Sequence, residues 1–160
     1  MKEEHNSFRL TQAIIVLSNS VTWEDAKNEW VLSEVYEEEE TATCLCGHHP
    51  IKEICVIRNK LNGKEAIVGN VCVKKFLGLP SDRIFSAIKR ISKDNAKSLN
   101  MESIEYMNKR GWLTVWEHGF YSDIINRRSL NDKQIAKKKE INLKLLQKSK
   151  NQFSRRGNRA

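Results

Sequence analysis

The chain has 160 residues, of which 39% are hydrophobic and 30% charged, and this length allows one domain with a buried core. It contains no run of about 18 apolar residues, which excludes a membrane-spanning helix. The formal net charge of +8 is unevenly divided: residues 1–43 contain ten acidic and three basic side chains, whereas residues 44–160 contain ten and twenty-five. This asymmetry predicts a polyanionic partner for the C-terminal part, and a role in solubility alone is the simpler alternative.

No signal peptide is expected. The chain begins with charged residues, and its first apolar run, residues 13–17, is too short and too far along to form the core of a signal sequence. We therefore expect the protein in the cytoplasm. In that reducing compartment, clustered cysteines indicate metal or redox chemistry before structural disulfides.

The acidic N-terminal segment predicts a short helix followed by a strand. Thr22 is a suitable N-cap. Trp23, Ala26 and Trp30 have the i, i+3, i+7 spacing of one helix face, and we expect this face to pack in the core. Residues 31–35 then alternate as in a strand that leads toward the cysteines.

A β-hairpin and a short helix are predicted for the middle of the chain. Residues 54–57 and 66–68 are rich in β-branched side chains, and Asn62-Gly63 between them is a strong signal for a hairpin turn. Residues 71–77 have the pattern of a short helix, which the glycine and proline that follow would end.

Everything after Pro80 is predicted to be helical. The expected N-caps of four helices are Ser81, Asn100, Thr114 and Asn131. The last two precede Glu117 and Gln134 by three residues, which is the spacing of a capping box.

Four large apolar side chains recur every fourth residue along the third of these helices: Trp112, Trp116, Phe120 and Ile124. This spacing predicts one stripe on the helix surface. We expect the stripe to pack in the core, and stacking on nucleic acid bases is the alternative.

All four cysteines of the chain lie within 29 residues. One leucine separates Cys44 from Cys46, eight residues separate Cys46 from Cys55, and sixteen separate Cys55 from Cys72. On the predicted elements, the first pair lies on a glycine-containing knuckle, the third on a hairpin strand and the fourth at the start of a helix, an arrangement that resembles a treble clef. Four thiolates would complete a tetrahedral Zn²⁺ site without an open position for catalytic water, so we predict structural zinc.

Other interpretations of the cysteines remain open. His48 and His49 are close enough to Cys46 to replace Cys55 as a ligand. A four-thiolate site also suits iron. The cysteines could instead be buried thiols without metal, or Cys44 and Cys46 could form a redox pair.

The pattern of residues 23–78, with its cysteines at 44, 46, 55 and 72, resembles that of small zinc-finger proteins of unassigned role encoded by bacteriophages and mobile genetic elements. The similarity is carried by C-x-C-G at 44–47, Ile-Arg-Asn at 57–59 and Val-Gly-Asn-Val-Cys-Val-Lys-Lys-Phe at 68–76, with fainter similarity at 116–121 and 129–134. In that group the first pair is often C-x-x-C and the third ligand can be histidine. The resemblance implies Cys44, Cys46, Cys55 and Cys72 as zinc ligands and the host cytoplasm as the location, but no activity.

The last predicted helix carries a row of lysines. At about 100° per residue, four of them fall within a sector of about 60°. We call these four the lysine row: Lys133, Lys137, Lys144 and Lys148. The row, with Arg155, Arg156 and Arg159 beyond it, could follow a phosphate backbone and would give salt-dependent affinity with little sequence readout. A solvated helix face is the alternative.

The sequence as a whole predicts an α+β fold, in which a small zinc-bound β-hairpin module resembling a treble clef packs with an all-α C-terminal part. The predicted segments are an acidic helix and strand over residues 1–43, the zinc module over 44–79, a helical region over 80–148 and a disordered basic tail over 149–160.

The predicted function is that of a nonenzymatic, zinc-stabilised accessory or regulatory protein of a phage or mobile element that binds DNA or RNA. The alternative is an adaptor or inhibitor that binds a host or defence enzyme, with the glutamates at 37–40 facing a basic protein partner. No membrane partner is expected. Nor is an enzyme, because the common catalytic motifs are missing; we expect Glu117 and His118 to serve surface or helix packing rather than a nuclease reaction.

Overall fold

The structure, a computed structural model, describes the backbone of residues 2–157 and the side chains of residues 4–38 and 42–149. The chain divides into two compact units, Met1–Asp82 and Arg83–Ala160, which we call the cysteine unit and the helical unit. An antiparallel sheet and several helices confirm the predicted α+β class.

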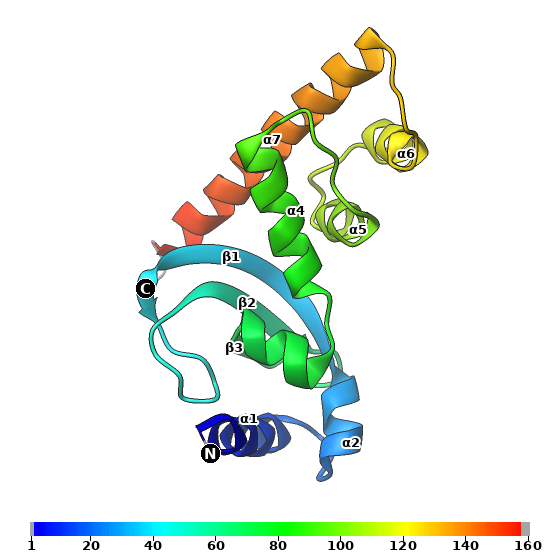
Figure 1. Cartoon of the computed structure of the whole chain (residues 1–160). Coiled ribbons are helices and arrows are strands. Elements are labelled where there is room, and N and C mark those ends of the chain that lie inside the picture. The colour runs from blue at the N-terminus through cyan, green and yellow to red at the C-terminus, as the bar shows by residue number, and fades with distance from the viewer. Residues whose placement is uncertain (1, 158–160) are drawn as a thin grey trace. The chain divides into compact units, whose positions relative to one another are not determined.

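The cysteine unit is built on a sheet of strand order β1-β2-β3 (Figure 1). Its elements are α1 (Lys2–Leu17), α2 (Trp23–Ala26), a 3-10 turn (Lys27–Glu29), β1 (Trp30–Ala42), β2 (Ile51–Asn59), β3 (Glu65–Gly69), α3 (Asn70–Cys72), a π-helical turn (Val73–Leu77) and the first residues of α4 (Ser81–Lys93). The predicted hairpin is confirmed as β2 and β3, whose register pairs Cys55 with Val68 and Ile57 with Ala66. The connection contains Gly63 at φ 75°, a conformation that favours glycine.

The segment before the hairpin largely follows the prediction. The Thr22 side chain caps α2 by accepting a hydrogen bond from the Asp25 backbone. Trp30 is buried, but it is the first residue of β1 rather than a helix residue. The predicted strand is confirmed and is longer than expected, because β1 continues to Ala42 and includes the four consecutive glutamates.

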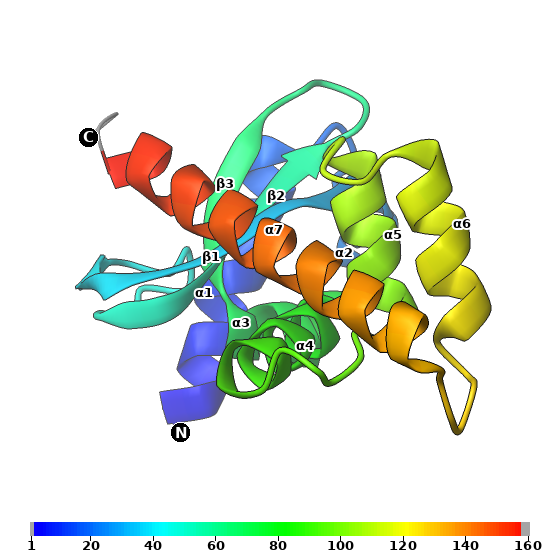
Figure 2. The same ribbon diagram turned by 90° about the horizontal axis from the view of Figure 1, so that it is seen from above.

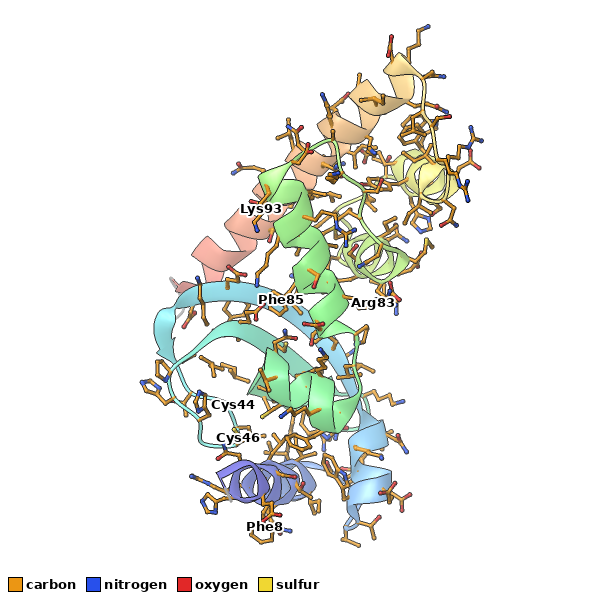
Figure 3. All side chains as sticks on the ribbon, in the orientation of Figure 1. Phe8, Cys44, Cys46, Arg83, Phe85 and Lys93 are labelled. Atoms are coloured by element: carbon orange, nitrogen blue, oxygen red, sulfur yellow. The ribbon has the colours of Figure 1, made fainter. Side chains whose placement is uncertain are left out.

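The 16-residue helix α1 is not predicted from the sequence. Leu10 and Ile14, one helical turn apart, are completely buried and form its core contact. Phe8 and Val16 are also apolar but are 64% and 77% exposed, and Figure 3 shows Phe8 on the side of α1 that faces away from the sheet. Exposed apolar residues of this kind obscure the helical periodicity of a short segment.

Glu29 is a buried carboxylate that joins three parts of the cysteine unit. Its Oε1 accepts hydrogen bonds from the Asn19 backbone N–H at 2.8 Å and from Asn59 Nδ2 at 3.0 Å, and its Oε2 accepts one from the Ser20 backbone N–H at 2.9 Å. These bonds, led by the one from Asn59, lower the pKa of Glu29 to about 2. The ionised side chain therefore fixes the connection between α1 and α2 to the end of β2.

The start of α4 is held against α3 by side-chain contacts. The sequence predicts Ser81 as an N-cap; in the structure Ser81 is the first residue of the helix, and its hydroxyl donates to Asn70 Oδ1 at 2.6 Å. Asn70 Nδ2 donates to Asp82 Oδ1 at 3.4 Å, and Lys74 Nζ lies 3.5 Å from the other oxygen of Asp82. Buried Asn70 thus uses both ends of its amide to hold Ser81 and Asp82.

The helical unit contains the rest of α4, α5 (Met101–Lys109), α6 (Val115–Ile124) and α7 (Asp132–Gly157). Figure 2 shows α5 and α6 side by side, with α7 running past both. The N-caps predicted at Asn100 and Thr114 are confirmed as capping boxes. Asn131 exchanges the equivalent pair of hydrogen bonds with Gln134 at the start of α7. The backbone of α7 is helical to Gly157, whereas the sequence predicts disorder from residue 149.

A buried polar network holds α6 and α7 to the connection between α4 and α5. The Tyr121 hydroxyl donates to Asn142 Oδ1 at 2.8 Å and accepts from the Leu99 backbone N–H at 3.0 Å. Asn142 Nδ2 donates to the carbonyl oxygens of Asn95 and Lys97, both at 2.9 Å. Burial raises the pKa of Tyr121 to about 12, so the phenol remains protonated, as its donor role requires.

The aromatic stripe is only partly buried, which corrects the expectation that it packs in the core. Ile124 is buried, and the Trp112 ring lies edge-on to Tyr106 with 6.0 Å between ring centroids. Trp116, in contrast, is 60% exposed and lies stacked on Phe120. Trp112 precedes α6, and within the helix a spacing of four residues drifts by about 40° per step, so exposed Trp116 and buried Ile124 are about 80° apart around its axis.

Candidate metal centre

Three of the four cysteines meet in the cysteine unit. Cys44 and Cys46 lie in the connection between β1 and β2, beside α1 (Figure 3), and Cys72 is the last residue of α3. Their sulfur atoms all lie within 4.8 Å of one another. The three residues are 3%, 1% and 9% exposed, so a bound ion would be shielded from solvent. We call them the cysteine cluster; it could hold a metal ion.

A tight turn positions Cys44 and Cys46. The Gly47 backbone N–H donates to the Cys44 carbonyl at 2.8 Å, and the Cys44 N–H donates to the His48 carbonyl at 2.9 Å. Leu45, between the cysteines, donates its N–H to a carbonyl of β3 at 3.0 Å. Gly47 has φ +96°, a conformation that would cost a residue with a Cβ on the order of 1–3 kcal/mol. The short knuckle therefore depends on glycine and on the neighbouring strand.

Backbone N–H groups stabilise negative charge on the sulfur atoms. Gly69 donates to Cys44 Sγ at 3.2 Å, and His48 donates to Cys46 Sγ at 3.4 Å. A hydrogen bond from the Cys72 thiol, helped by that from Gly69, lowers the pKa of Cys44 to about 5. The same bond raises the pKa of Cys72, and burial raises that of Cys46. A bound cation would displace the remaining protons, because the thiolate is the form that binds metal.

Arg9 of α1 lies close to the knuckle and is not predicted from the sequence. A Cβ placed on Gly47 would be only 2.5 Å from Arg9 Nη1, so the guanidinium lies directly against this glycine. This places a permanent positive charge one residue away from Cys46, where it can offset part of the negative charge of a thiolate-bound ion. No sequence pattern connects residue 9 with the cysteines, because the contact depends on how α1 packs.

The structure does not bring Cys55 into the cysteine cluster, so the predicted set of four sulfur ligands is reduced to three. Cys55 is completely buried in the middle of β2, opposite Val35 on β1 and Val68 on β3. Side chains alternate along a strand, so Cys55 is on the opposite face from Ile54, whose cross-strand partner Gly69 contacts the cluster. Burial raises the pKa of Cys55 to about 12, as expected for a neutral core thiol.

His48 and His49, the alternative ligands, also lie outside the cluster. Both side chains are exposed, and His49 Nδ1 lies 2.7 Å from Thr43 Oγ1. His48 contacts the cluster through its backbone, whose N–H donates to Cys46 Sγ and whose carbonyl accepts from the Cys44 N–H. The three thiolates could supply three of the four ligands of a tetrahedral ion, and the fourth would come from another donor.

The lysine row borders the buried face of α7 rather than lying on its solvent side. Ile141, which is about one turn from both Lys137 and Lys144, is 1% exposed. Lys133 and Lys148, at the two ends of the row, are exposed. The row therefore lies along the boundary between the buried and the exposed faces of α7, and the lysines at its two ends are exposed.

Two lysines of the row make contacts within the helical unit. Lys137 Nζ lies 3.3 Å from Glu140 and 5.3 Å from the centre of the Trp116 ring. Lys144 forms an ion pair with Glu117 of α6. The sequence could not reveal these partners, because Trp116 and Glu117 belong to another helix. The side chains of the predicted nucleic-acid contacts Arg155, Arg156 and Arg159 lie outside the described residues.

Glu117 and His118 point to different partners. Glu117 accepts the Thr114 backbone N–H at 2.9 Å, in addition to pairing with α7. The His118 ring nitrogen Nε2 lies 2.8 Å from Glu105 Oε1 on α5. Both side chains thus serve contacts between or within helices.

Comparison with known proteins provides no further information on the metal centre. No protein family, curated protein or solved structure matches the chain. Across the described residues, none of the helices combines the length and the apolar composition that crossing a bilayer requires. The candidate metal centre therefore stands on the spacing, burial and hydrogen bonding of the cysteine cluster.

Proposed function

We propose that the protein is a nonenzymatic, zinc-stabilised nucleic-acid-binding protein with an accessory or regulatory role. The observation that carries this proposal is the separation of two features: the buried cysteine cluster is in one unit and a large excess of positive charge is in the other. The helical unit contains 19 lysines and arginines but only 7 aspartates and glutamates. A phage or mobile element as the genetic setting, implied by the resemblance of residues 23–78, is part of the same proposal.

Zinc is the ion proposed for the cysteine cluster. Three thiolates with one histidine form a common structural zinc site, whereas iron centres of this kind usually use four thiolates. The exposed imidazoles of His48 and His49 directly follow the knuckle, and one of them is proposed as the fourth ligand. A knuckle and a helix joined by a hairpin also support the treble-clef-like description of this module.

The charge of the helical unit supports a polyanionic partner. Lysines bind phosphates without reading bases, so the expected binding is largely independent of sequence and steeply dependent on salt. The test is a fluorescence-anisotropy titration of the zinc-loaded full chain with labelled single- and double-stranded DNA and RNA. With about five phosphate contacts, affinity should fall a few hundred-fold between about 50 and about 200 mM salt.

Substitution of exposed lysines on α7 tests whether the helical unit is responsible for this binding. The variant Lys133→Gln/Lys139→Gln/Lys148→Gln should weaken binding and reduce the logarithmic salt slope by about 3. Point variants are preferable to deletion of α7, because Ile141 and Leu145 are buried and a deletion would open the core.

A matched control removes the same charge from the cysteine unit. Lys52, Lys60 and Lys64 are also exposed, and the variant Lys52→Gln/Lys60→Gln/Lys64→Gln should keep the salt slope near the wild-type value. Equal losses in the two triple variants would contradict the assignment to the helical unit. Absence of binding to every oligonucleotide at low salt would contradict the proposed function and favour a protein partner.

A further inference from the structure

We propose that α6 carries a base-stacking site for single-stranded nucleic acid, formed by Trp116 and Phe120. This inference rests on the proposed function and specifies the kind of strand and the residues that hold it. The two rings are stacked with centroids 5.1 Å apart and an angle of 11° between their planes, and Trp116 is 60% exposed. We call them the aromatic pair.

Burial in the helical unit accounts for half-buried Phe120 but not for Trp116, which is 60% exposed. The buried side of α6 is formed by Tyr121 and Ile124, which are 0% and 2% exposed. Gly119, in the middle of this helix, is a turn away from Trp116, and a Cβ added to it would meet no atom within 4 Å. A glycine inside a helix costs about 1 kcal/mol relative to alanine, and no contact requires it here. Gly119 therefore adds no side chain to the surface of α6 next to the aromatic pair.

The charge around the aromatic pair selects a polyanion as the ligand. Lys137 Nζ lies 5.3 Å from the centre of the Trp116 ring, and exposed Lys133 is one turn earlier on α7. In the ion pair of Lys137 with Glu140, the lysine side chain is 34% and the glutamate side chain 71% exposed, so a phosphate could replace the carboxylate with little loss. A phosphate held by these lysines would place its base within reach of Trp116.

Stacking on an aromatic side chain requires a single-stranded ligand. In a duplex both faces of each base are covered by neighbouring bases, whereas an unpaired base can lie against a protein ring. Such stacking tolerates any sequence, because every base has a π-face. The aromatic pair therefore predicts preference for the unpaired state of the strand, with phosphates bound by the same lysines that would bind a duplex.

The test compares Trp116→Ala with the wild-type full chain, using fluorescein-labelled oligo(dT), oligo(U) and a DNA duplex, each of about 15 nucleotides per strand. We expect Trp116→Ala to weaken binding of the single strands about 5- to 150-fold, the range that one stacked base supplies, and to change duplex binding little. Trp116→Phe should restore most of the loss, because it keeps an aromatic ring. Comparison of the affinities for oligo(dT) and oligo(U) shows whether the protein prefers single-stranded DNA or RNA.

Val115→Ala is the matched control, since Val115 precedes Trp116 and is 92% exposed but has no ring. This variant should bind like wild type. Circular dichroism checks the helices of every variant, and Trp116→Leu, which keeps apolar volume without a ring, repeats the test if alanine disturbs α6.

The results separate the stacking site from the proposed function. Salt-dependent binding of single strands that Trp116→Ala and Trp116→Leu leave unchanged would overturn the stacking site while the proposed function stands. The same loss for Trp116→Ala and Val115→Ala would also overturn it, because general apolar contact would then explain the effect. Absence of binding to all three oligonucleotides would overturn both proposals.

Discussion

Cys55 and the cysteine cluster have different surroundings, and single substitutions should separate them. Serine at Cys44, Cys46 or Cys72 should abolish stoichiometric binding of Co²⁺ or Zn²⁺, because each removes one of three adjacent sulfurs. Cys55→Ala should retain metal binding and lower the free energy of unfolding by about 1–2 kcal/mol through lost core packing. Thiolate-to-cobalt absorption measures the first effect and urea unfolding the second. Loss of the cobalt spectrum in Cys55→Ala would show instead that Cys55 is a fourth ligand, as the sequence predicts.

Glu29 makes the stability of the cysteine unit dependent on acid. Its folded pKa of about 2 is below its ordinary value of 4.5, so the ionised carboxylate stabilises the fold above that value. The contribution should disappear as the pH falls from about 4.5 to about 2. Glu29→Gln should therefore lower the urea midpoint at neutral pH, and its difference from wild type should shrink over this interval.

Urea unfolding of both proteins at each pH provides the Glu29 measurement. Comparison at equal pH cancels acid-induced loss of metal, which affects both proteins alike. A difference between the two midpoints that stays constant down to pH of about 2 would show that the carboxylate charge is not responsible.

Among the structural elements, the turn between β1 and β2 should depend on the backbone of Gly47. Gly47→Ala should weaken zinc binding and lower the free energy of unfolding by on the order of 1–3 kcal/mol, because its φ of +96° disfavours a side chain. Arg9→Ala should weaken zinc binding less, since it removes only a neighbouring charge. Competition for zinc with a coloured chelator measures the zinc affinity of both variants.

A double variant distinguishes backbone strain from collision with Arg9. The nearest atoms to a new Cβ on Gly47 belong to the end of the Arg9 side chain, which can move away. Arg9→Ala/Gly47→Ala should therefore bind zinc at least as weakly as Gly47→Ala. Recovery of zinc affinity in the double variant would assign the effect to the collision instead.

At the scale of the whole molecule, the two units should respond differently to removal of metal. Structural zinc in a small module is worth on the order of 10 kcal/mol, and the cysteine cluster connects the β1–β2 turn with α3. Chelation should therefore speed hydrogen exchange of backbone amides in residues 44–77 much more than in residues 83–149. Exchange followed by mass spectrometry measures this difference, and zinc-supplied Cys46→Ser should behave like the chelated wild type. Equal acceleration in both units would contradict their independence.

The sequence by itself determined the local features of this protein. The Asn62-Gly63 turn and the N-caps at Asn100, Thr114 and Asn131 each depend on residues a few positions apart, so they could be predicted without a structure. The proximity of Cys44 and Cys46 to Cys72 followed from placing the pair on a knuckle before the hairpin and Cys72 on the helix after it. These signals act within one element or between consecutive elements.

Only the tertiary structure decided which predicted site residues act together. Cys55 is separated from the cluster by the face that the β2 register assigns to it, and Arg9 reaches Gly47 because α1 packs beside the turn. Trp116 is exposed because another face of α6 is covered, and Lys137 is drawn toward it from α7. The physical reason is common to these cases: the direction and the partner of a side chain depend on contacts between residues far apart in the sequence, which no local pattern encodes.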